Sequence, residues 1–211
     1  APEFSRMFAA RTCMMAGVGL TGVFLWYLVR FWVYGKAVVL TSAPLTIPAG
    51  FLIAGMAVAT LIGAALASWA AGPISERIEE KNIPVARVVA GACLLYAIGL
   101  GLAWGLGVWS TGTARENGML LFALISGFAF GIYDSLGLEL VMDSLPDPRR
   151  AGHDLGIYAL ANSAGLALAA IIGALLVNAF EHSFGYYLLF PSAIVMVLLA
   201  GIVTLTTKSA E

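Results

Sequence analysis

The stretch AGPISERIEEKNI, residues 71–83, is a short charged island between two long apolar segments. Gly72 stands four residues before an acid–base pair, Glu76 and Arg77, and further charges follow as far as Lys81. Charges at this density avoid a bilayer core, whereas the apolar segments on either side are long enough to cross one. The island therefore predicts a short loop that joins two transmembrane helices.

The composition of the whole chain agrees with a membrane protein. Of its 211 residues, 61% are hydrophobic and 11% are charged, whereas soluble domains carry about 25% charged residues. A soluble fold of this size would lack the polar residues that cover its surface. The net charge of −1 favours neither nucleic acid nor an acidic partner. The lipid bilayer is therefore the expected solvent, and nucleic acid is not an expected partner.

Six apolar stretches are long enough to span the hydrocarbon core, which needs about 20 residues. We expect an all-α, polytopic membrane protein with one domain over residues 1–211 and no room for a soluble domain. Cys13 and Cys93 lie inside spans and match neither a disulfide framework nor a metal-ligand spacing, so no cofactor or metal is expected. The predicted helices cover roughly residues 8–34, 44–71, 84–109, 118–142, 155–179 and 185–206.

Lysine and arginine are distributed unevenly between the two sides of the predicted bundle. Six spans place both termini on one side, which holds Arg6, Arg11, Arg77, Lys81, Arg87, Arg149, Arg150 and Lys208. The other side holds Arg30, Lys36 and Arg115. Because cytoplasmic loops carry the excess of Lys and Arg, both termini and the loops at 72–83 and 143–154 are predicted to be cytoplasmic. The loops predicted to face outward are 35–43, 110–117 and 180–184.

Small residues recur four apart in the fourth and fifth spans. Gly127 and Gly131 form one such pair, and Gly165, Ala169 and Gly173 form a stripe. Small residues at this spacing let helix backbones approach closely in lipid. These positions are predicted to pack helix against helix, and static packing is favoured over a moving hinge for any single pair.

Two acids lie inside the fourth span. Asp134 is roughly 13 Å from the end near Asp143, and Glu139 is roughly 6 Å from it. A carboxylate in mid-membrane costs at least about 2.5 kcal/mol, so Asp134 is expected to face a partner or a water-filled cavity. There it can load and release a proton, as a proton-coupled carrier requires. The alternative, a structural acid satisfied by a neighbouring helix, is favoured for Glu139; about 140° of helix separates the two, so they do not form a dyad.

Five further side chains are candidates for a substrate cavity. Asn162 lies about two turns into the fifth span, where an interhelical hydrogen bond is the favoured alternative. Trp26 and Tyr27 lie near the outer end of the first span, where an interfacial aromatic belt is the favoured alternative. Tyr133 and Tyr158 are cavity candidates of the same standing.

The second inner loop reads DSLPDPRRAGHDLG, residues 143–156, and Asp154 suits the N-terminus of the fifth helix. The frame of Gly72, Glu76 and Arg77 resembles the cytoplasmic loop motif of the major facilitator superfamily. The second loop resembles the one between the tenth and eleventh helices of many bacterial carriers of that family. With the six spans, the resemblance covers essentially the whole chain and implies the C-terminal six-helix half bundle, helices seven to twelve.

The resemblance also implies a gate at the cytoplasmic face. In the inward-closed state Arg77 pairs with Asp143, and Glu76 contacts the start of the fifth helix near Arg150. Exposed pairs of this kind contribute about 0–1 kcal/mol each, enough together to bias a two-state equilibrium. The alternative is a solvated loop that only sets topology. The predicted gate comprises Gly72, Glu76, Arg77, Asp143, Arg150 and Asp154.

The resemblance implies half of a secondary active transporter in the bacterial cytoplasmic membrane, which moves a small organic solute by alternating access, with or without proton coupling. The aromatic residues of the chain and its few charges inside the membrane suggest a weakly charged, sugar-like or drug-like solute. One half supplies one wall of a central site, so a second six-helix half is expected from the same polypeptide, a second copy or another chain. Because Ala1 is not an initiator methionine, a larger polypeptide is preferred.

Two other classes of function are alternatives for this sequence. A non-transporting subunit could keep the same fold and assemble or stabilise a larger membrane complex, with Asp134 held by a fixed partner. An intramembrane enzyme is not expected, because the sequence has no HExxH and no GxSxG motif.

Overall fold

The computed structural model describes residues 2–34, 46–109, 112–143, 151–180 and 182–207, which are helical throughout apart from short turns and contain no strand. Six stretches are long and apolar enough to cross a membrane, as predicted. The elements are α1 (Pro2–Gly22), α2 (Leu25–Tyr27), the π-helical segment η1 (Leu28–Val33), α3 (Thr46–Glu80), α4 (Val85–Trp109), α5 (Thr113–Asp143), α6 (Ala151–Ala179) and α7 (His182–Leu205).

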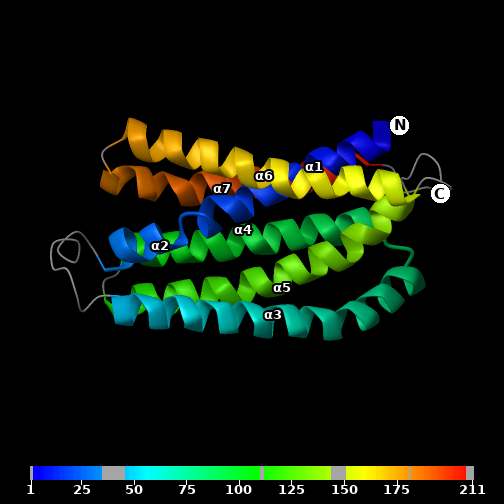
Figure 1. The fold of residues 1–211 in the computed structure, drawn as a ribbon. Coiled ribbons are helices and arrows are strands. Elements are labelled where there is room, and N and C mark those ends of the chain that lie inside the picture. The colour runs from blue at the N-terminus through cyan, green and yellow to red at the C-terminus, as the bar shows by residue number, and fades with distance from the viewer. Residues whose placement is uncertain (1, 35–45, 110–111, 144–150, 181, 208–211) are drawn as a thin grey trace.

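The helices form two groups of three. α5 packs against α3 and α4, while α1 packs against α6 and α7. The groups meet mainly where α4 packs on α7, and only lightly where α1 passes α5. Both chain termini lie at the same end of the bundle as the turn from α3 to α4 (Figure 1), as six antiparallel spans require. We call this the inner end, following the orientation predicted from the positive charges.

The first span begins earlier than predicted. α1 starts at Pro2 rather than near residue 8, so its first two turns extend it at the inner end. Arg6 holds this extension in place, because its Nη1 donates hydrogen bonds to Thr206 O and Glu3 Oε1, both at 2.9 Å. The extension places Arg11 well inside the helix.

The charged island is not a loop along most of its length, which corrects the prediction for residues 72–83. α3 continues through Pro73 to Glu80 because Ile74 and Ile78, one turn apart, pack on the core and because Glu, Arg and Lys are good helix formers. Asn82 then adopts a left-handed φ of 50°. Its N–H donates to Glu79 O, and the Ile83 N–H donates to Ile78 O at 3.0 Å. These two bonds form a Schellman cap that ends the helix.

The small-residue pairs are sites of close helix packing. A Cβ atom on Gly127 would collide with the backbone of Thr60, so α5 touches α3 there without intervening side chains. One turn on, a Cβ on Gly131 would lie 2.6 Å from Ala67 Cβ. In α6, a Cβ on Gly165 would lie 2.6 Å from Thr12 O of α1. Both predicted stripes therefore bring neighbouring backbones together.

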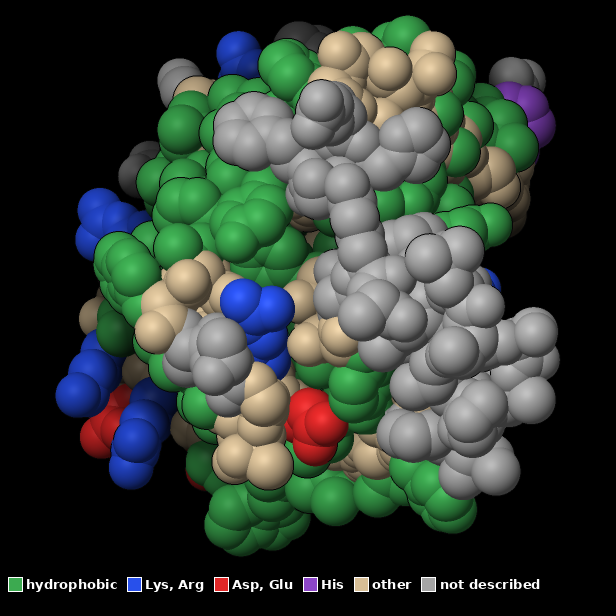
Figure 2. Space-filling view, turned by 90° about the vertical axis from the view of Figure 1, so that its left-hand side faces the viewer, with side chains coloured by type: hydrophobic (Ala, Val, Ile, Leu, Met, Phe, Trp, Pro, Cys, Tyr) green, Lys and Arg blue, Asp and Glu red, His purple; other side chains and the backbone are tan. Residues whose placement is uncertain are grey.

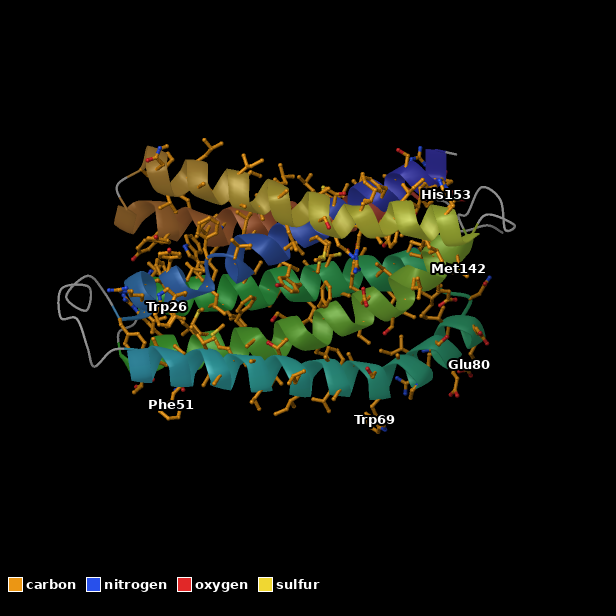
Figure 3. All side chains as sticks on the ribbon, viewed as in Figure 1. Trp26, Phe51, Trp69, Glu80, Met142 and His153 are labelled. Atoms are coloured by element: carbon orange, nitrogen blue, oxygen red, sulfur yellow. The ribbon has the colours of Figure 1, made fainter. Side chains whose placement is uncertain are left out.

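The outer surface is strongly apolar, and α3 and α6 are its most exposed helices. In their most hydrophobic segments 22% of residues are buried, against 39–50% in the other four spans. Phe51 and Trp69 project from α3 away from the bundle (Figure 3), with 73% and 79% of their surface exposed. Figure 2, which looks onto the end opposite the termini, shows flanks dominated by hydrophobic side chains. α3 and α6 therefore offer apolar faces for lipid or for another helical unit.

Candidate functional site

Asp134 forms an ion pair with Arg11 inside the bundle. Arg11 Nη1 donates to Asp134 Oδ1 at 2.6 Å. Arg11 lies nine residues after the start of α1 at Pro2 (11 − 2), and Asp134 lies nine residues before the end of α5 at Asp143 (143 − 134). Both are therefore about 14 Å along their helices from the same end of the bundle. The pair links α1 to α5, where the two groups of helices otherwise meet only lightly.

A third helix contributes to this pair. Arg11 Nε donates to Asn162 Oδ1 on α6 at 2.7 Å. Asn162 can reach Arg11 because Gly165, less than one turn further along α6, lies directly against the backbone of Thr12. The small-residue stripe thus sets the distance at which an amide on α6 meets a guanidinium on α1.

Three aromatic rings surround the guanidinium. Its carbon atom lies 5.6 Å from the ring centre of Phe130, 5.7 Å from that of Tyr133 and 5.9 Å from that of Tyr158. Aromatic faces attract a cation at this range, more strongly where water is excluded. The rings, the amide and the carboxylate together fix the position of the Arg11 side chain.

The two partners of the ion pair differ in exposure. Of the side-chain surface, 11% is exposed for Arg11 and 55% for Asp134. Ser135, next to Asp134 in the sequence, and Ser163, next to Asn162, are also exposed. Arg11 therefore lies deeper in the bundle than Asp134. Part of the Asp134 side chain remains accessible at the surface of the bundle. Chemically, this is a buried fixed cation covered by an accessible anion.

The structure brings together four of the seven predicted cavity residues. All four contact Arg11: Asp134, Asn162, Tyr133 and Tyr158. Tyr133 is fully buried, so it contacts the guanidinium from the interior of the bundle. We call these four, with Arg11 and Phe130, the Arg11 cluster. Asp134 thus has a partner on a neighbouring helix, which both the carrier hypothesis and the structural alternative allow.

Three predicted cavity residues lie outside the Arg11 cluster. Glu139 is exposed and forms no ion pair with any described residue. Trp26 and Tyr27 lie in α2 near the outer end (Figure 3 labels Trp26), and Tyr27 stacks on Tyr186 with ring centres 6.4 Å apart. The positions of Trp26 and Tyr27 agree with the aromatic-belt alternative, whereas no ion pair to a neighbouring helix is described for Glu139.

The predicted cytoplasmic gate is described only in part. Gly72, Glu76 and Arg77 are exposed on the last turns of α3, where Arg77 forms no ion pair with a described residue. Asp154 lies in the first turn of α6, and one of its oxygens is 3.4 Å from His153 Nδ1. The Asp143 side chain and Arg150 lie outside the described residues. The pairing of Arg77 with Asp143 therefore stays a prediction.

Arg11 is the central residue that the sequence analysis did not assign to the site. It was counted among the positive charges of the inner side, because the predicted span began at residue 8. A signal was present nonetheless: Arg11 and Asp134 are opposite charges that both fall within apolar stretches near the same end. Charges inside a membrane usually pair with one another, so matching charges by depth would have suggested this contact.

A second polar link joins the first span to α5 near the outer end. Arg115 Nη1 donates to Trp32 O at 2.9 Å and lies over the Trp32 ring. Just past the first span, burial and then the nearby Glu116 carboxylate raise the pKa of Tyr34 to about 12. The first span is thus attached to α5 at two levels, one of which is the Arg11 cluster.

Comparison with known proteins identifies the family. The family model described as the Major Facilitator Superfamily matches residues 48–211, which is most of the chain. No curated protein and no solved structure gave a significant match. The matched region includes α3 from residue 48 onward and α4 to α7, and therefore the α5 and α6 parts of the Arg11 cluster. With its six apolar helices and this match, the chain belongs to the Major Facilitator Superfamily.

Proposed function

We propose that the chain is one six-helix half of a secondary active transporter, which moves a small organic solute by alternating access together with a proton. Members of this superfamily are transporters built from two six-helix halves, with the site between them near the bilayer midplane. The Arg11 cluster is the polar centre of this half, and it lies at a comparable depth. Asp134 carries the proposal, because it is a carboxylate well inside the bundle with 55% of its side-chain surface exposed.

The second half is proposed to cover the face on which Asp134 is exposed. Ser135 and Ser163 are exposed beside Asp134 and Asn162, and polar groups inside a membrane face a cavity or a partner rather than lipid. The apolar, weakly buried flanks of α3 and α6 can pack against that half, which belongs to the same polypeptide, a second copy or another chain. The proposed setting is the bacterial cytoplasmic membrane, with both termini inside.

The experiment is a proton-flux measurement in vesicles that contain the full-length protein and a pH-sensitive dye. A panel of anionic, neutral and cationic organic solutes is added outside, and solute-driven proton movement is recorded. Asp134→Asn should lower the coupled flux at least about 100-fold, which corresponds to about 2.7 kcal/mol. Glu139→Gln is the matched control, since it neutralises an exposed acid on the same helix and should retain the flux. An unchanged flux in Asp134→Asn would refute the role of this acid.

One observation favours a second candidate, a non-transporting subunit. Asp134 is already paired with Arg11 within this half, and such a pair can hold α1 against α5 without taking part in transport. In that case Asp134→Asn lowers stability, no solute in the panel moves protons, and the purified protein has the mass of a complex with unrelated chains. The flux and the particle mass together separate the two candidates.

A further inference from the structure

The charge balance of the Arg11 cluster limits what can bind there. Arg11 is always charged and nearly buried, and Asp134 supplies the one compensating negative charge among the described residues around it. A cation left unpaired inside a bundle is strongly unfavourable. At each stage of a transport cycle the cluster therefore needs one anion beside Arg11.

We infer that Arg11 recognises an anionic solute, a monocarboxylate, which takes the place of the Asp134 carboxylate when that acid is protonated. This inference rests on the proposed transport function and names its substrate class. One proton and one monoanion enter together, the proton on a carboxylate oxygen of Asp134 and the anion on the guanidinium. The cluster keeps the same net charge before and after, and the anion and the proton together carry no net charge across the membrane.

The geometry around Arg11 suits this exchange. The guanidinium has five N–H donors in one plane, which match a carboxylate in two parallel hydrogen bonds. The described bonds use the Nε donor for Asn162 and one Nη1 donor for Asp134. When Asp134 is protonated and the ion pair is lost, Asn162 and the three rings still hold the guanidinium in place. The anion thus meets a donor group that is already oriented, which lowers the entropic cost of binding.

Other solute charges fit less well. A cation bound to Asp134 would draw the carboxylate away from Arg11 and leave the cluster with one excess positive charge. A neutral solute could hydrogen-bond to the exposed part of Asp134. Its binding would not require Asp134 to be protonated, so it would not explain proton coupling. A monoanion with a proton is the combination that preserves the charge balance. This replaces the weakly charged solute expected from the sequence with a charged one.

The groups that face Asp134 from each neighbouring element are consistent with this assignment. Arg11 comes from α1, Tyr158 from α6, and Tyr133 from α5 itself. α4 contributes Cys93, which lies near Tyr133. The described titratable side chains of α3 lie at residues 76–80, and none of them pairs with Asp134. Arg11 is thus the cation that is left without a counter-ion when Asp134 is protonated.

The test uses three probes of one shape, acetate, acetamide and acetamidinium, whose charges are −1, 0 and +1. Their affinities for the full-length protein are measured from thermal unfolding at equal ionic strength. Asp134→Ala and Asp134→Asn leave Arg11 without its carboxylate, so acetate should bind them about 10- to 100-fold more tightly than it binds wild type. The other two probes should show no gain. Adding Arg11→Met to either variant should abolish the acetate gain, whereas Glu139→Gln should behave as wild type.

The outcomes separate the substrate class from transport itself. Equal acetate affinity with and without Arg11, or a larger gain for acetamidinium, would overturn the anion assignment. If neither Asp134 variant folds, wild type carries the test: affinity for methanesulfonate, which stays charged, must rise as the pH falls, and a flat profile overturns the assignment. Acetate binding without any monocarboxylate flux would refute transport but keep the site. Proton-coupled flux of cations or neutral solutes alone would support the proposed transport function but refute the assignment of an anionic substrate.

Discussion

Two charged regions of this molecule behave in opposite ways. The inner end of α3 carries charge at five of the six positions from 76 to 81, yet its charged side chains are exposed and form no ion pair with any described residue. The Arg11 cluster holds only two charged residues, and both are engaged. Water at the membrane surface solvates each charge separately, whereas inside a bundle polar groups must satisfy one another. Depth in the membrane, rather than the density of charge, therefore marks the candidate site.

The inner end of α3 also differs from the helix crossings inside the bundle in its backbone packing. Gly72, in the charged region, has open space where a Cβ would be, whereas Gly127, one turn before Gly131 on α5, lies against the backbone of Thr60. Gly165 plays a similar part beside Asn162. A side chain would thus fit at Gly72, whereas the close helix contacts at Gly127 and Gly165 leave no room for one.

The largest expected effect comes from breaking the Arg11–Asp134 pair. Asp134→Asn should destabilise the protein by about 3 kcal/mol, because it leaves a buried cation without its counter-ion. Arg11→Met should cost a similar amount, because it also removes the hydrogen bond to Asn162 and the contacts with the three aromatic rings. Unfolding of the single variants in detergent, together with the double variant, gives the coupling energy. A loss below about 1 kcal/mol for Asp134→Asn would contradict the view that Arg11 is buried and needs this counter-ion.

A smaller effect is expected from the contrast between glycines. Gly127→Ala should cost about 2 kcal/mol, because the new methyl group meets the Thr60 backbone and α3 must move away from α5. Gly72→Ala should be neutral or stabilise the end of α3 by up to about 1 kcal/mol, since alanine favours helix and nothing lies nearby. Thermal unfolding of the two variants side by side measures the difference. Equal losses at both positions would show that the close crossing of α3 and α5 is not a determinant of stability.

The smallest effect concerns the predicted cytoplasmic gate. Arg77→Asp should shift the balance between inward-closed and inward-open forms by no more than about 1 kcal/mol, because the side chain is exposed. Exchanging the charges, with Asp143→Arg added, should restore part of the shift. Spin-label distances across the inner face of the full-length protein report the balance. If these distances do not change in either variant, residues 72–83 do not form a gate and only set the orientation of the helices in the membrane.

Much of the fold followed from the sequence because lipid imposes simple constraints on it. Six apolar stretches become six helices, since a chain in hydrocarbon must satisfy its own backbone hydrogen bonds. The glycine stripes at 127–131 and 165–173 pack as their spacing indicated. The inner end of α3 was less predictable, because Ile74 and Ile78 continue the helical spacing into a segment whose charges indicated a loop.

The candidate site was predictable only in part. Asp134, Asn162, Tyr133 and Tyr158 stood out as polar or aromatic residues inside apolar spans. The sequence did not indicate that all four converge on one arginine, because α1, α5 and α6 are far apart in the chain and Arg11 was assigned to the membrane surface.

The amino-acid sequence alone determined that this is a polytopic helical membrane protein, because hydrophobicity and helical spacing are local properties that a bilayer reads directly. Tertiary structure alone decided that Arg11 and Asp134, 123 residues apart, form a pair. It also decided that the arginine lies behind the acid rather than in front of it. Those two facts depend on how three helices cross, and the crossing is set by backbone contacts at small residues.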